Sequence, residues 1–116
     1  MLELKATTSH ATAKRLQRLA KLYEQGQASR LMERTLQKLM SYEIELCHTH
    51  LAELHQDLAA LEQQYGWSSA EFYERYQAGQ TDDRIDYVEW ASLVQMTENL
   101  QARLRVLKGD ESPPTS

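Results

Sequence analysis

The feature that most restricts the fold of this chain is a stretch from Ser29 to Gln64 that contains no glycine and no proline. Its apolar residues follow one another at spacings of four or three, and they are Leu36, Met40, Ile44, Cys47, Leu51, Leu54, Leu58, Leu61 and, at the end, Tyr65. This heptad seam, sustained for about four repeats, predicts one helix roughly 55 Å long. A short neighbour cannot cover a seam of that length.

Two shorter helices are expected on either side of the long one. The first covers about residues 9–24, and Gly26 is placed to end it in the left-handed conformation. After the long helix, Gly66 breaks the chain and residues 68–71, S-S-A-E, have the pattern of a capping box. The helix that starts there is short, because Gly79 ends it.

A last helix is expected over about residues 83–107, with Thr81 or Asp82 as its N-cap. The first half of this helix has apolar residues on several sides, whereas the apolar residues of its second half form a single seam. The predicted fold is therefore all-α: a helical bundle of four helices in which the long helix and the last helix form an antiparallel, coiled-coil-like hairpin. The two shorter helices are expected to cover the ends of this hairpin.

The length of 116 residues, with 41% hydrophobic and 26% charged residues, fits one domain with one modest core. We expect a single helical domain over residues 1–108 and a disordered tail over 109–116, where GDESPPTS has two prolines and no apolar residue. A single cysteine excludes a disulfide framework within the chain. Without an apolar run long enough for a membrane span, the expected location is the cytoplasm, away from membranes.

The net charge of −4 is unevenly distributed along the chain. Residues 1–40 carry eight basic and three acidic side chains, whereas residues 41–66 carry five acidic and none basic. A basic stripe in the first helix, which could bind nucleic acid, consists of Lys14, Arg15, Arg18 and Lys21. Against nucleic-acid binding, the whole chain is acidic and shows no helix-turn-helix pattern.

The long helix has a charge gradient of its own. Its N-terminal end carries Arg30, Arg34 and Lys38, and its C-terminal half carries Glu53, Asp57 and Glu62. This order is unfavourable for the helix dipole, but two such helices running antiparallel would bring each basic end to an acidic end. The gradient favours a homo-oligomer, most simply a dimer, or a partner with complementary charge.

Metal binding and catalysis are the alternatives that the polar residues of the long helix raise. The residues concerned are Cys47, His48, His50 and His55, and Glu45 with His48 makes the Glu-x-x-His spacing of di-iron bundles. Such sites need a second motif of this kind, which the chain lacks. Cys47 lies on the seam, where a buried and inert thiol is expected. No G-x-S-x-G, phosphate-binding or H-E-x-x-H pattern occurs, so we expect neither an enzyme nor a cofactor or metal site.

The segment from Tyr65 to Trp90 holds seven of the nine aromatic residues of the chain and six carboxylates. Tyrosine and tryptophan are common anchors of protein interfaces, and surrounding acid selects a basic partner. We expect Phe72, Tyr76 and Trp90 inside and Tyr73 and Tyr87 more exposed. The predicted partner-binding residues are Tyr73, Glu74, Asp82, Asp83, Asp86 and Tyr87.

The pattern Y-G-x-S-x-x-E-F-Y-x-R-Y-x-A-G, followed by D-x-x-D-Y-x-E-W-A-x-L, covers about residues 65–93. It resembles small uncharacterised all-helical proteins of bacteria and archaea that are suspected antitoxins. The resemblance implies a protein that binds and neutralises a cognate toxin, and it supplies no catalytic residues. Because the predicted tail is short, neutralisation would use a folded helical face. A structural or scaffolding homodimer is the alternative.

Overall fold

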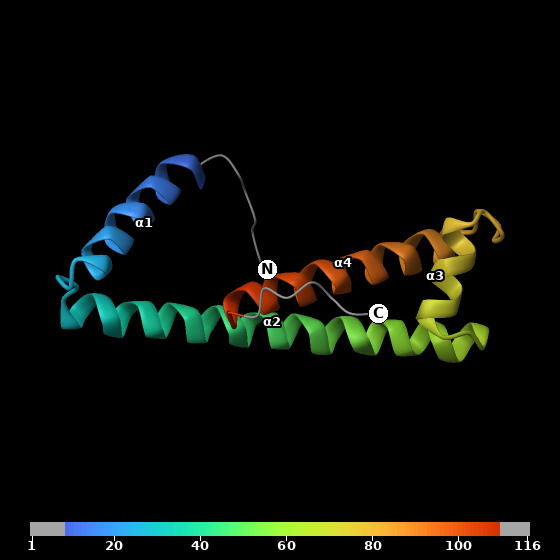
Figure 1. Cartoon of the computed structure of the whole chain (residues 1–116). Helices are drawn as coiled ribbons and strands as arrows, with labels where there is room; N and C mark the ends of the chain where they lie inside the picture. Colours follow the sequence, from blue (N-terminus) through green and yellow to red (C-terminus); the bar gives the residue numbers. More distant parts are fainter. Residues whose placement is uncertain (1–8, 110–116) are drawn as a thin grey trace. The chain divides into compact units, whose positions relative to one another are not determined.

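In the computed structural model, which describes residues 9–109, four α-helices and no strand are present. They are α1 (Ser9–Glu24), α2 (Arg30–Tyr65), α3 (Ser69–Gln77) and α4 (Ile85–Leu107) (Figure 1). The predicted all-α fold with four helices is therefore confirmed. Apart from Gly109, the predicted tail lies outside the described residues.

The chain divides into two compact units, with the boundary between Leu39 and Met40, inside α2. We call them unit 1, with described residues 9–39, and unit 2, with described residues 40–109. Two successive spacings of four in the seam, from Leu36 to Met40 and from Met40 to Ile44, fall at this boundary. The single domain expected over residues 1–108 stays a prediction.

Unit 1 contains α1 and the first ten residues of α2. Gly26 ends α1 with φ +70°, and two backbone bonds close the turn, from Gly26 N–H to the Tyr23 carbonyl and from Gln27 N–H to the Leu22 carbonyl. These are the bonds of a Schellman motif, so the predicted role of Gly26 is confirmed. The Ser29 hydroxyl accepts from Met32 N–H at 3.1 Å and caps the start of α2.

Unit 2 is built on an antiparallel pair of helices, the C-terminal part of α2 and α4. At one end the Tyr65 hydroxyl donates to the Asp86 carboxylate at 2.5 Å, and at the other the Arg103 guanidinium donates to Glu43 at 3.3 Å. Residue numbers thus rise along α2 as they fall along α4 (Figure 1). The predicted helical hairpin is confirmed within this unit.

The predicted seam of α2 is buried where α3 and α4 accompany it. Its buried members are Cys47, Leu51, Leu54 and Leu58, at spacings of four, three and four. Leu36, the first member of the predicted seam and part of unit 1, is 40% exposed. The sequence pattern therefore placed the right face inward, but full burial is confined to the section that other helices cover.

The first half of α4 is the enclosed half, as its composition predicted. Tyr87, Trp90 and Ala91 are buried in this half, and Thr97 is buried just after it. The Thr97 hydroxyl, the polar group among them, donates to the Leu93 carbonyl at 2.9 Å, which satisfies it inside the unit. None of the helices within residues 9–109 combines the length and apolar character needed to cross a membrane.

Only one of the two hydrogen bonds of the predicted capping box is present at the start of α3. The Ser68 hydroxyl accepts from Glu71 N–H at 3.1 Å, as predicted. The Glu71 carboxylate, however, pairs with Arg75 at 3.4 Å. A carboxylate from α2 binds the helix start instead, because Glu62 accepts from Ser69 N–H at 2.8 Å. The cap of α3 is thus partly a tertiary contact.

The start of α4 differs from the prediction. The N-cap residue is Arg84, without a side-chain capping bond, rather than Thr81 or Asp82. Asp82 is nevertheless close, because its carboxylate accepts from Arg84 N–H at 3.1 Å. Asparagine and aspartate commonly bind the backbone two residues ahead in this way, which makes a turn before the helix instead of a cap on it.

Candidate functional site

The aromatic residues of the predicted contact segment mostly form the core of unit 2. Phe72 of α3 and Trp90 of α4 are fully buried, and their rings stack with centroids 4.0 Å apart and an interplanar angle of 3°. The Trp90 indole N–H donates to the Ser69 hydroxyl at 3.0 Å. Leu58 of α2 joins the same buried cluster. The predicted inward positions of Phe72 and Trp90 are confirmed.

The expected exposure of Tyr87 is wrong. Its side chain is 7% exposed, because it packs against Tyr65 at a ring-centroid distance of 5.2 Å and against Phe72 at 5.3 Å. Tyr76, expected in the core, is half-buried beside Phe72. Helical periodicity places Tyr76 on the face of Phe72 in α3 and Tyr87 on the face of Trp90 in α4, whereas the packing of the helices against one another decides which ring lies deepest.

The six predicted partner-binding residues do not form one open surface. Tyr87 is buried, and Asp86 accepts the hydrogen bond from Tyr65. The hydroxyl of the half-buried Tyr73 donates to the Gln95 side chain at 3.0 Å. The side chains of Glu74 and Asp83 are exposed. The accessible part of the predicted surface therefore consists of these two carboxylates, the edge of Tyr73 and the exposed Asp82 carboxylate, which is paired with Arg84.

Arg84 organises the loop before α4 and was not singled out by the sequence. Its guanidinium binds the Asp82 carboxylate through two bonds, of 2.9 and 2.7 Å. It also lies over the Tyr87 ring, 4.6 Å from the centroid, and over the Tyr65 ring at 5.7 Å. This is a cation–π arrangement in which Arg84 covers the aromatic core from the solvent side. The Asp-x-Arg spacing in the loop is the signal that could have indicated it.

These contacts shift two pKa values in opposite directions. The hydrogen bonds from Arg84 lower the pKa of the Asp82 carboxyl below its usual 3.8. The hydrogen bond to the Asp86 carboxylate raises the pKa of the Tyr65 hydroxyl above its usual 10.0, because it favours the neutral phenol. Near neutral pH, Asp82 is therefore charged and Tyr65 is neutral.

The cysteine and histidines of α2 are spread around the helix. Cys47 is fully buried on the seam, as predicted, and His48 and His55 are exposed. The half-buried His50 lies 3.8 Å from the Glu53 carboxylate, measured from Nδ1. Within residues 9–109, no three His, Cys, Asp or Glu side chains are grouped as metal ligands.

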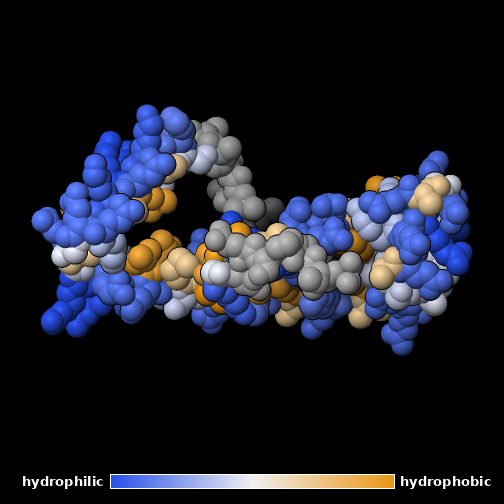
Figure 2. All heavy atoms as spheres, in the orientation of Figure 1, coloured by the Kyte–Doolittle hydropathy of each residue, from blue (hydrophilic) through white to orange (hydrophobic). Residues whose placement is uncertain are grey.

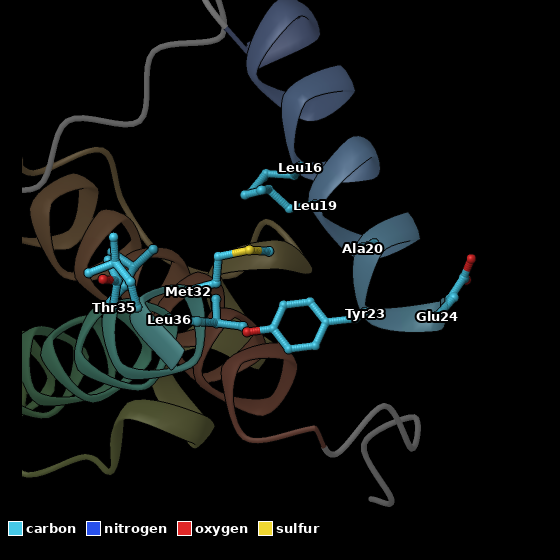
Figure 3. A pocket seen from close by; sticks show the side chains of 10 residues that line it. Leu16, Leu19, Ala20, Tyr23, Glu24, Met32, Thr35 and Leu36 are labelled. Atoms are coloured by element: carbon cyan, nitrogen blue, oxygen red, sulfur yellow. The ribbon is translucent and has the colours of Figure 1, made fainter. Parts of the chain in front are cut away.

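An open apolar groove in unit 1 was not predicted. It has a volume of about 570 Å³ and lies between α1 and the first part of α2 (Figure 3). We call it the unit 1 groove; its lining residues are Leu16, Leu19, Ala20, Tyr23, Glu24, Leu31, Met32, Thr35, Leu36 and Leu39. No residue of α1 is buried, and its predicted basic stripe, formed by Lys14, Arg15, Arg18 and Lys21, is exposed.

Comparisons of this chain with protein-family models, with curated proteins and with solved structures gave no match, so the residues themselves carry the functional argument.

Proposed function

We propose that this chain is a non-enzymatic protein-binding module, whose acidic unit 2 binds a basic surface of a partner protein. The charge of unit 2 is the observation that supports the proposal. Its described residues include twelve acidic and five basic side chains, a net charge of −7. A surface of one sign attracts a partner of the other sign and excludes partners of its own.

Ion pairs within unit 2 involve most of its basic side chains, so the charged groups left unpaired on its surface are mostly carboxylates. Three of its five basic side chains pair with carboxylates of the same unit, in Arg75–Glu71, Arg84–Asp82 and Arg103–Glu43. Glu74 on α3 and Asp83 in the following loop remain exposed and have no basic partner among these three pairs. The buried rings hold these elements together, so little ordering is needed when a partner binds.

The specific role we propose is that of an antitoxin, which binds a cognate toxin with a basic surface and neutralises it. Support comes from the resemblance of residues 65–93 to suspected antitoxins and from the negative charge of that region. In this role the folded helical face occludes the toxin.

The test is co-purification of the chain with the product of the neighbouring gene, together with growth of cells that express that product with and without this chain. The double charge reversal Glu74→Lys and Asp83→Lys should weaken binding at low salt by about tenfold or more. Glu98→Lys, an exposed position on α4, changes the sign of a charge in the same unit and should have little effect. No complex and no rescue of growth would refute the proposal.

A scaffolding homodimer is the second candidate, favoured by the charge gradient of α2. The basic side chains Arg30, Arg34 and Lys38 and the acidic side chains Glu53 and Asp57 are all exposed. Two copies with antiparallel α2 helices would match these charges. Analytical ultracentrifugation at low and high salt distinguishes the candidates, because such a dimer should dissociate as salt screens the pairs.

A further inference from the structure

The unit 1 groove concentrates exposed apolar side chains on two helices that face each other. Leu31 is 74% exposed, Leu16 and Leu39 are each 51% exposed, and Leu19 is 43% exposed. Figure 2 shows hydrophobic surface on the side of α1 that faces the start of α2 and on the facing side of α2. Single exposed leucines are ordinary, but a contiguous set around one hollow is typical of a binding surface.

The closed end of the groove is held in a defined geometry. Tyr23 of α1 donates from its hydroxyl to the Glu33 carboxylate of α2 at 2.9 Å. The Schellman turn at Gly26 and the cap at Ser29 lie directly between these residues in the chain. The two walls are thus joined by a short, hydrogen-bonded turn, and the groove opens between two regular helices.

The shape and lining of the groove fit one additional helix. Two adjacent helices that expose apolar rows can be completed by a third, whose apolar residues at i, i+3, i+4 and i+7 enter the space between them. Figure 3 shows Leu16 and Leu19 pointing from α1 toward Met32 and Leu36 of α2. Leucine and methionine side chains adapt their rotamers to an incoming apolar surface.

The charge around the groove selects the sign of the occupant. Unit 1 has seven basic and two acidic side chains among its described residues, a net charge of +5. Of the two acids, Glu33 is bound to Tyr23 and to the Gln37 amide, and Glu24 points away from the apolar side chains (Figure 3). Lys38 follows Leu31 by seven residues, two helical turns along nearly the same row, so a basic group borders the apolar lining.

We propose that the unit 1 groove binds one amphipathic helix of a partner protein, with an apolar stripe that enters the groove and Asp or Glu residues flanking that stripe. Lys38, which borders the lining, pairs with a flanking carboxylate, and the remaining positive charge of unit 1 attracts the acidic helix at longer range. This binding surface is separate from the acidic surface of unit 2. A second copy of unit 1 fits the groove less well, because it would bring two surfaces of charge +5 together.

The experiment measures fluorescence anisotropy of labelled peptides with the full chain. The first peptide is an amphipathic helix of the same length as α1, 16 residues, with a leucine stripe flanked by Glu. The second has Lys at the flanking positions, and the third has the composition of the first with the leucines scrambled. We expect the Glu peptide to bind at least about tenfold more tightly than the Lys peptide at low salt, and the difference to shrink as salt is added. The scrambled peptide should not bind.

Variants of the chain locate the binding. Leu31→Asp places a charge in the groove and should abolish binding, whereas Val106→Asp, at a 67% exposed position on α4, should leave it unchanged. The double variant Arg34→Glu and Lys38→Glu should lose or reverse the preference for the Glu peptide, and it serves as the second test if Leu31→Asp lowers the helix content measured by circular dichroism.

Several results would overturn this inference. Equal affinity for the Glu and Lys peptides would refute the charge selection, and unchanged binding by both the Leu31 variant and the double variant would place the site elsewhere. No binding by any peptide would also refute it. A dimer in ultracentrifugation that Leu31→Asp dissociates would show that a second copy fills the groove. The variants at Leu31, Arg34 and Lys38 all lie in unit 1, so their results are independent of the test of unit 2.

Discussion

The replacement of Phe72 by alanine tests whether the aromatic segment is a core or a contact surface. Phe72 is the buried residue of α3, fully enclosed between Trp90, Tyr87 and Trp67, with ring centroids 4.0, 5.3 and 6.2 Å away. Because α3 is only nine residues long, it has little stability of its own and depends on this contact.

The expected loss of stability is large relative to the total free energy of unfolding of unit 2. Truncation of a fully buried phenylalanine to alanine typically costs 3–5 kcal/mol, of order 4 here, because transfer, cavity and ring-stacking contributions all apply. The 70 described residues of unit 2 correspond to a total stability of about 4–10 kcal/mol at typical values per residue. Phe72→Ala should therefore remove about half of the free energy of unfolding or more.

Urea denaturation followed by tryptophan fluorescence measures this loss directly. Both tryptophans, Trp67 and Trp90, lie in unit 2 and contact Phe72, so the signal reports this unit. With a slope of about 1.5 kcal/mol per molar urea, the midpoint should fall by about 2–3 M. Val88→Ala, at a 52% exposed position on α4, is the control and should shift it by less than about 0.5 M. Similar shifts for the two variants would refute the assignment of these rings to the core.

The remaining predictions concern the hydrogen bonds and the turn at the same corner. Because the hydrogen bond to Asp86 raises the pKa of Tyr65 above 10.0 in the folded chain, its contribution to stability is complete below pH 10 and is lost as the pH rises further. Tyr65→Phe should weaken the fall in urea midpoint as the pH rises above about 10, and an unchanged alkaline slope would contradict this pKa shift. Glu62→Ala removes the acceptor of Ser69 N–H and should cost about 1 kcal/mol in urea denaturation, whereas Glu62→Gln, which keeps an acceptor, should cost less. Gly66→Ala should lower the free energy of unfolding by about 1 kcal/mol because φ is +75°, although no atom lies within 4 Å of an added Cβ. Gly66→Asn should lower it by less, because asparagine adopts positive φ more readily. Equal urea midpoints for both variants and the parent would argue against strain at this turn.

Local signals in the sequence were sufficient for the helices. The bounds of α1 agree with the prediction at both ends, and Gly26 and Ser68 have the predicted roles at a helix end and a helix start. These features depend on a few neighbouring residues, whose backbone conformations and capping bonds follow from residue type. The start of α4 was predicted wrongly because Asp82 can either cap a helix or form a turn before it, and the local sequence does not distinguish these two roles.

The candidate sites were harder to predict, because exposure depends on the elements that cover a residue. Tyr87 and Tyr73 both lie in the acidic and aromatic segment, yet Tyr87 is buried and Tyr73 remains at the edge. Arg84 lies over the ring of Tyr87, which is close to it in the sequence, and over the ring of Tyr65, which is distant. No residue next to Arg84 in the chain indicates that it lies over Tyr65.

Taken by itself, the sequence determined that this chain is helical, where its helices begin and end to within about two residues, and which face of α2 is apolar. The tertiary structure decided how much of that face is covered. Leu36 and Leu58 both belong to the predicted seam, but Leu36 is 40% exposed and Leu58 is 8% exposed. The physical reason is that periodicity sets the direction of a side chain, whereas burial also needs a neighbouring surface: α3 and α4 supply it around Leu58, and α1 leaves the groove beside Leu36 open.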